Sequence, residues 1–190
     1  MRILVCVKQV PDAAEVRLNE DFTIQREGAA HRMNPADESA LELGLSLRDT
    51  HGGRVTVLTM GPAQAAGMLR ETISRGADSA LLLNSPAFAG SDTLATARAL
   101  KAAAETLGGF DLILCGRRAA DGETGQVGPM LASMLNIACV SNALDMQMAD
   151  GSAEVTQLLE TAFRYGGAIC RWLLRYANGA TGCGCRDWLA

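Results

Sequence analysis

The chain has 190 residues and 48% of them are hydrophobic, which is enough to bury the core of a single domain. Its 17 Lys and Arg residues against 21 Asp and Glu give a net charge of −4, which argues against nucleic acid as the main partner. The six cysteines, with no secretory signal ahead of them, indicate a reducing compartment, and we expect a cytoplasmic protein without membrane insertion.

Five short apolar runs recur at wide spacing along the chain. They are continuous rather than alternating, as expected of strands that are buried on both faces of a sheet. Each is therefore predicted to be a strand of one central sheet. The runs are residues 3–7, 55–60, 80–83, 112–115 and 138–140.

Helical patterns separate these runs. The first helix is predicted to begin at Asn34 and Pro35, because asparagine is a good N-cap and proline suits the first helical position. Further helices are predicted over residues 62–75 and 91–107, and a fourth follows the glycine-rich stretch at 121–129. Strands that alternate with helices predict an α/β fold, with a doubly wound, mostly parallel sheet of the Rossmann-like type.

Two segments interrupt this rhythm. Residues 9–33 are polar and are predicted to form a small hairpin, and residues 168–176 are predicted to form one short helix. Both Trp and both Tyr residues lie after residue 164. We therefore predict an α/β domain over residues 1–160 and a tail of different character over residues 161–190.

The glycine-rich stretch at residues 121–129 reads D-G-E-T-G-Q-V-G-P and lies between a predicted strand and a predicted helix. Gly122, Gly125 and Gly128 let the backbone come close to a ligand, and Thr124 and Gln126 add hydrogen-bonding side chains. The pattern is neither a P-loop nor a G-x-G-x-x-G fingerprint. Two interpretations remain open here, a phosphate-binding turn and an ordinary polar loop.

Small or polar residues follow four of the predicted strands, where parallel sheets bind their ligands. Lys8 follows the first strand and Met60 ends the second, while residues 90–93 and 116–129 follow the next two. Helix N-termini at three of these places favour a bound anion. The alternative is that these residues only form the turns and caps that any such sheet needs.

The ordered set of motifs resembles the β subunit of electron-transfer flavoprotein, including its nitrogen-fixation-associated and bifurcating relatives. The resemblance covers about residues 1–157. It rests on I-L-V-C-V-K-Q-V-P-D at 3–12, M-N-P-x-D-E at 33–38, M-G-P at 60–62, G-A-D at 76–78, G-S-D-T-L-A-T-A at 90–97 and the stretch at 121–129.

This resemblance implies a subunit that pairs with an electron-transfer flavoprotein α subunit. The complex carries electrons between flavin dehydrogenases, such as acyl-CoA dehydrogenases, and an acceptor. The β subunit binds AMP in the housekeeping branch and a second FAD in the bifurcating branch. The form D-G-x-T-x-x-V-G-P looks more like the bifurcating branch, so FAD is the expected cofactor and AMP the alternative.

The resemblance also implies which residues meet the nucleotide. Cys6 matches a strand residue beside the nucleotide, and residues 34–37 match the loop that opens the first helix. Met60 matches a residue near the adenine, and the residues from Thr124 onwards match the phosphate turn and its helix. Lys8 is added because it follows the first strand, where it could meet a phosphate or flavin or be only a surface charge, and Asp121 because it begins the stretch at 121–129. The predicted cofactor-binding residues are Cys6, Lys8, Asn34, Pro35, Ala36, Asp37, Met60, Asp121, Gly122, Thr124, Gly125, Gln126, Val127, Gly128, Pro129 and Met130.

The likeness to the family stops after Ala162. Two alternatives to an electron-transfer subunit therefore stay open: a stand-alone adenine-nucleotide-binding module without a redox role, and a truncated, non-functional subunit. The sequence has neither a Ser/His/Asp arrangement nor a poised pair of carboxylates, and Cys183 and Cys185 with Cys170 lack the paired spacing of a metal site. We expect an electron carrier in which the flavin does the chemistry, with no catalytic residues of its own and no metal.

Overall fold

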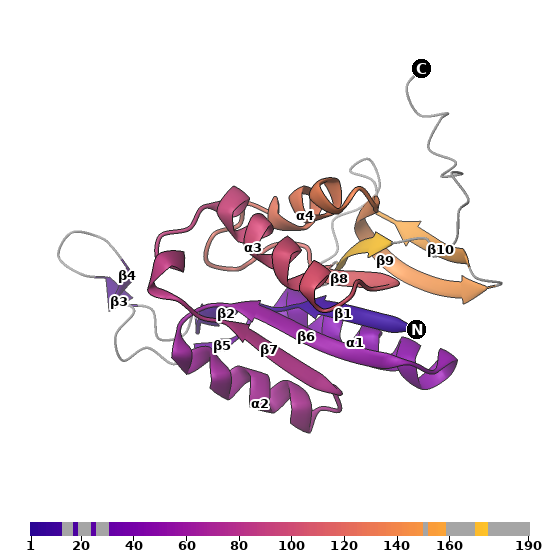
Figure 1. Ribbon diagram of the computed structural model, residues 1–190, viewed down its shortest axis with the longest axis horizontal. Coiled ribbons are helices and arrows are strands. Elements are labelled where there is room, and N and C mark those ends of the chain that lie inside the picture. The colour runs from indigo at the N-terminus through magenta and orange to yellow at the C-terminus, as the bar shows by residue number, and fades with distance from the viewer. Residues whose placement is uncertain (13–16, 19–23, 26–30, 150–151, 159–169, 175–190) are drawn as a thin grey trace, which may run out of the picture.

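The computed structural model describes residues 1–12, 17–18, 24–25, 31–149, 152–158 and 170–174. In this part of the chain the central sheet has the strand order β10-β9-β11-β8-β1-β6-β7 (Figure 1). Helices cover both of its faces, so the predicted α/β fold is confirmed.

Four neighbouring strands form the parallel half of the sheet. Their registers pair β1 with β6 and β8, and β6 with β7, all in parallel. They coincide with four of the five predicted apolar runs, because strands covered by helices on both faces need continuous apolar sequence. Their bounds are Arg2–Cys6 for β1, Arg54–Met60 for β6, Ser79–Leu83 for β7 and Leu112–Gly116 for β8.

The helices divide between the two faces of the sheet, as Figure 1 shows. The buried residues of α1 and α2 pack against one face, and those of α3 and α4 pack against the other. The bounds are Pro35–His51 for α1, Ala66–Ser74 for α2, Thr93–Thr106 for α3 and Val127–Leu135 for α4, with short 3₁₀ turns at Ala63–Ala65 and Pro86–Phe88.

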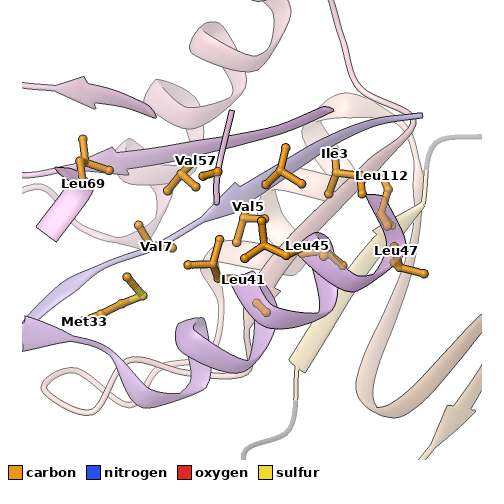
Figure 2. Packing of buried hydrophobic residues seen from close by; sticks show 14 of the residues in the cluster. Ile3, Val5, Val7, Met33, Leu41, Leu45, Leu47, Val57, Leu69 and Leu112 are labelled. Atoms are coloured by element: carbon orange, nitrogen blue, oxygen red, sulfur yellow. The ribbon is translucent and has the colours of Figure 1, made fainter. Parts of the chain in front are cut away.

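The larger hydrophobic cluster lies between β1 and α1 (Figure 2). Ile3 and Val5 of β1 meet Leu41 and Leu45 of α1, and all four are buried. The helix lies close to the strand because position 44 is glycine: a Cβ there would lie 3.1 Å from Cγ2 of Val5. This close packing fixes where α1 begins relative to the end of β1.

The remaining strands of the sheet run antiparallel. They are β9 at Ala138–Ala149, β10 at Ser152–Gln157 and β11 at Cys170–Leu174. The fifth apolar run is thus a strand, but it belongs to an antiparallel group. The helix predicted over residues 168–176 is wrong in the described segment, because β11 pairs with both β8 and β9. Five residues are too few for periodicity to separate helix from strand, and pairing with two neighbours decides the outcome.

The hairpin predicted within residues 9–33 is confirmed in the segments that the structure describes. β2 at Gln9–Pro11 pairs antiparallel with β5 at His31–Met33. A second pair joins β3 at Arg17–Leu18 to β4 at Ile24–Gln25. The first pair returns the chain to the carboxyl end of β1, where the backbone N–H of Asn34 donates to the carbonyl of Lys8 at 2.9 Å.

Candidate functional site: a crevice at the carboxyl ends of β1 and β8

The order of the strands creates a topological switch point between β8 and β1, and we call its carboxyl end the crevice, after the site that such sheets form there. From β1 the chain continues through α1 on one face of the sheet, whereas from β8 it continues through α4 on the other. At such a point the two connections leave in opposite directions, and α/β proteins bind ligands there. The N-termini of α1 and α4 and the loop of residues 117–126 lie at this carboxyl edge. We call these last residues the β8–α4 loop.

The floor of the crevice is the buried carboxylate of Asp37, in the first turn of α1. Its Oδ2 accepts the backbone N–H of Lys8 at 2.7 Å, and its Oδ1 accepts that of Gly116 at 3.1 Å. Burial raises the pKa of Asp37 to about 7, against the lowering effect of hydrogen bonds from Asn34, Lys8 and Gly116. One side chain therefore joins the ends of β1 and β8 to the start of α1.

Gly116 is glycine because of this contact. A Cβ at position 116 would lie 2.0 Å from Oδ1 of Asp37 and 2.8 Å from the backbone carbonyl carbon of Ala36. No side chain fits in that space, so α1 can approach β8 only over a glycine. Sequence reasoning missed this role, although Gly116 ends the apolar run L-I-L-C-G.

The prediction that the side chain of Asn34 caps α1 is wrong. Asn34 occupies the N-cap position, but its side chain makes no capping hydrogen bond. Its Nδ2 instead donates to the carbonyl of Arg118 at 2.9 Å, and its Oδ1 accepts the N–H of Ala120 at 3.1 Å. Pro35 has no N–H to cap, and the N–H of Asp37 already donates to the Asn34 carbonyl at 2.8 Å. The amide is thus left to bind the β8–α4 loop.

Two further contacts fasten the same loop. Nζ of Lys8 lies 2.7 Å and 2.8 Å from the two carboxylate oxygens of Asp121, near the surface. At the far end of the loop, the hydroxyl of Thr93 donates to Oε1 of Gln126 at 3.1 Å. The loop is therefore held to β1, to the start of α1 and to the start of α3. Thr93 lies in the G-S-D-T motif, but its contact with Gln126 could not be read from sequence.

The N-terminus of α4 has no side-chain cap. Gln126 occupies the N-cap position with its side chain turned to Thr93, whereas Asp92 caps α3 by accepting the N–H of Ala95 at 2.7 Å. The first N–H groups of a helix have no partner inside the helix, and they bind anions well. In α4 these groups include those of Val127 and Gly128.

The backbone of the β8–α4 loop uses one of its glycines for conformation. Gly125 has a φ of 57°, in the left-handed region that favours glycine. Gly122 has no such φ, and a Cβ built there would meet nothing within 4 Å. Asp121, Gly122, Thr124 and Gln126 are exposed, so they are accessible to a ligand.

Cys6 and Met60 lie on the α3/α4 side of the sheet, beside the crevice. Cys6 is buried and is the register partner of Cys115 on β8. A side-chain hydrogen bond between Cys115 and Cys6, together with burial, raises the pKa of the Cys115 thiol well above its usual value. Cys115 therefore stays a protonated thiol at neutral pH and is not a nucleophile, and it packs as a small apolar side chain beside Cys6.

All predicted cofactor-binding residues thus lie at the carboxyl edge of the sheet: on β1 or just after it, on β6, in the β8–α4 loop, or at the starts of α1 and α4. Pro35 is exposed, Ala36, Pro129 and Met130 are half-buried, and Gly128 is buried. A cavity of about 250 Å³ lies instead at the amino edge, between Arg2, Arg54 and Phe110. There the Arg2 guanidinium donates to the carbonyls of Leu107 and Gly108 at the end of α3, which is a structural role.

Within the described residues, no group of three or more His, Cys, Asp or Glu side chains is arranged to hold a metal ion. Over the same residues, each helix is too short or too polar to cross a bilayer.

Residues 21–165 match the family described as "Electron transfer flavoprotein domain". The chain belongs to the electron transfer flavoprotein family. It is 45% identical over 164 residues to the electron transfer flavoprotein subunit beta of Thermoanaerobacterium thermosaccharolyticum. It is 46% identical over 166 residues to the acryloyl-CoA reductase electron transfer subunit gamma of Anaerotignum propionicum, and 45% identical over 168 residues to the protein FixA of Azorhizobium caulinodans.

These alignments cover 84–86% of this chain but 60–63% of each relative. The chain therefore spans about three fifths of the length of the curated electron transfer flavoprotein relatives that it matches. The resemblance found in the motifs is confirmed at the level of the family, including relatives with the FixA name.

Proposed function

We propose that this chain is the nucleotide-binding part of an electron-transfer flavoprotein β-type subunit, which holds FAD, or AMP as the alternative, in the crevice between β8 and β1. The observation that carries the proposal is the uncapped N-terminus of α4 beside a loop that Asn34, Lys8 and Thr93 hold in place. The names of the relatives support an electron-transfer subunit over a stand-alone binding module, because several are named as subunits of electron-transfer complexes.

The residues of the crevice fit a nucleotide in two ways. The N–H groups at the start of α4 and the hydroxyl of Thr124 suit a phosphate group, since they provide donors and a positive helix end. Cys6 and Met60 provide an apolar wall that suits the adenine ring. When FAD is bound it supplies the electron-transfer chemistry, and the chain's own residues bind and orient it.

Lys8 is a second candidate for a phosphate contact. Its Nζ pairs with Asp121 near the surface, where the attraction between the two charges is weak because water screens it. A phosphate at the start of α4 would compete with Asp121 for this ammonium group. We therefore propose that Lys8 pairs with Asp121 before the nucleotide binds and contributes to the phosphate site afterwards.

We further propose that residues 1–160 bind the nucleotide and that residues 161–190 do not complete an interface with an α subunit. The described part of this tail, β11, pairs within the sheet of the nucleotide-binding domain. Co-expression with an electron-transfer flavoprotein α subunit tests the proposal. A stable one-to-one heterodimer that retains flavin and passes electrons to a flavin dehydrogenase would contradict the statement about the tail.

The nucleotide site is tested by Gly125→Val, with Gly122→Ala as the matched control in the same loop. Valine strongly disfavours the left-handed φ of 57° at position 125, so we expect a distorted loop and loss of the nucleotide. The control adds a methyl group in open space and should retain the nucleotide. Heating the purified chain releases the nucleotide, and its mass distinguishes FAD from AMP. Wild-type retention by a folded Gly125→Val variant would overturn the site.

A further inference from the structure

The carboxyl edge of the sheet, which holds the proposed site, also holds a buried carboxylate. The side chain of Asp37 is 6% exposed, and its oxygens accept the backbone N–H groups of Lys8 and Gly116. Because those N–H groups end β1 and β8, the carboxylate lies between the two strands that form the crevice. A second anion at this edge would therefore be placed near a negative charge that water does not screen.

Three other carboxylates among the described residues of this edge have a cationic partner. Asp121 of the β8–α4 loop pairs with Lys8, which follows β1. Glu123 of the same loop pairs with Arg118, and Glu38 of α1 pairs with Arg32 of β5. Asp37 instead accepts hydrogen bonds from backbone and amide N–H groups. Two titratable neighbours act on it, the cationic Lys8 and Cys115 of β8, which stays a neutral thiol.

The charge of Asp37 depends on a small energy difference. Burial favours the neutral acid, whereas the three hydrogen bonds and the Lys8 charge favour the carboxylate, and the balance places the pKa of Asp37 at about 7. A phosphate nearby adds a negative charge and draws Lys8 towards itself. Both effects disfavour the ionised form of Asp37, so both raise its pKa further in the complex.

We propose that binding of a phosphate-bearing nucleotide in this crevice is coupled to the uptake of one proton from solvent by Asp37. The inference rests on the proposed function, because it assumes that the nucleotide occupies the crevice. In this reading Asp37 is a positioning residue: it holds β1, β8 and α1 together, and its protonation removes the charge that opposes the phosphate.

The sign of the pH dependence follows from the two states of Asp37. Below the pKa of the free protein, both the free protein and the complex are protonated, and affinity does not change with pH. Above it, the free protein must take up a proton to bind, so the dissociation constant rises by up to tenfold for each pH unit. The rise ends above the pKa that Asp37 has in the complex.

Isothermal titration calorimetry of the full chain with FAD, and separately with AMP, tests the coupling between pH 6 and pH 9. At each pH the titration is repeated in two buffers of different ionisation enthalpy, which counts the protons transferred. We expect an uptake approaching one proton between pH 7.5 and 8.5, where the AMP phosphate is already fully ionised. Asp37→Asn should bind with a dissociation constant that does not depend on pH in this range. Asp49→Asn, an exposed residue of the same helix, should keep the wild-type dependence.

The outcomes separate this inference from the proposed function. Binding of FAD or AMP by the wild-type chain with no proton transfer, or with proton release, overturns the coupling and leaves the nucleotide site intact. Absence of binding at every pH overturns both. Because the proton count comes from the wild-type chain, the result stands even where Asp37→Asn does not fold.

Discussion

At both edges of the parallel sheet, an aspartate carboxylate accepts a backbone N–H group from the end of a strand, but the carboxylates differ in burial. At the amino edge, Asp78 accepts the N–H of Val55 at 2.8 Å and Asp111 accepts that of Arg2 at 2.7 Å, near solvent. At the carboxyl edge, Asp37 accepts two such N–H groups in a buried position. The pKa of Asp78 is lowered, chiefly by its hydrogen bond from Val55, whereas burial raises that of Asp37.

The comparison shows that a charged carboxylate which accepts the N–H at a strand end can either stabilise or destabilise the fold at neutral pH. Near solvent, the hydrogen bond and Arg48 favour the charged form of Asp78 at little cost in desolvation. In the interior, the desolvation of Asp37 outweighs its hydrogen bonds. The desolvation cost of Asp37 falls at the carboxyl edge, which holds the candidate site. Strained or energetically unfavourable groups are often found at functional sites.

The largest expected effect is a pH dependence of stability from Asp37. Its pKa is raised from 3.8 in the unfolded chain to about 7 in the fold. Its contribution to the free energy of unfolding is full below pH 3.8 and is lost as the pH rises through 7, a change on the order of 4 kcal/mol. Urea unfolding of wild type and Asp37→Asn between pH 4 and pH 8 measures it. A difference between the two proteins that stays constant with pH would contradict the raised pKa.

Gly116→Ala should produce the next largest effect. The new Cβ collides with Asp37 and the backbone of α1, so we expect the free energy of unfolding to fall by about 3 kcal/mol. We also expect nucleotide binding to be lost. Gly61→Ala is the matched control at the end of β6, because a Cβ there meets Ala65 at an ordinary 3.6 Å. Denaturant midpoints of both variants give the comparison. Equal stability of the two would show that α1 moves away from β8 without cost.

Asn34→Ala should cost about 2 kcal/mol, because it leaves the carbonyl of Arg118 and the N–H of Ala120 unpaired in a partly buried place. It should also weaken nucleotide binding by loosening the β8–α4 loop. Asp92→Ala removes a true helix cap and should cost about 1 kcal/mol with little change in affinity. Affinity that falls equally in both variants would place the origin of the effect outside the Asn34 contacts.

The smallest expected effect belongs to the amino edge. Asp78→Asn removes the attraction to Arg48 and weakens the acceptor of the Val55 N–H, at a loss of roughly 1 kcal/mol near neutral pH. Because the pKa of Asp78 is lowered, the stabilisation is present above pH 3.8 and is lost as the pH falls through its folded value. The stabilities of the two proteins should therefore converge at low pH. At neutral pH the wild type should be the more stable of the two, which is the reverse of the difference expected at Asp37.

How much of this could be predicted from the sequence depends on whether a feature is local. The parallel strands and the helix starts were predicted, because continuous apolar runs and residues such as Asp92 are local signals. The contacts of Asn34 and Asp37 were not, since each joins groups about 80 residues apart along the chain or across two strands. A buried aspartate at the start of a helix looks like an ordinary first-turn acid in sequence. Its burial follows from Gly116, which only the fold brings near.

Strand β11 has a consequence for the order in which the sheet is assembled. It lies between β8 and β9, so the hairpin of β9 and β10 joins the parallel strands through a segment that is synthesised after both. Until residues 170–174 leave the ribosome, the apolar strand β8 has an open edge. Open strand edges pair readily with other chains. The pairing of β11 with β8 is slow to form, because it closes the long stretch of chain between Gly116 and Cys170. Aggregation during synthesis should therefore respond more strongly to changes in β11 than to changes in the crevice.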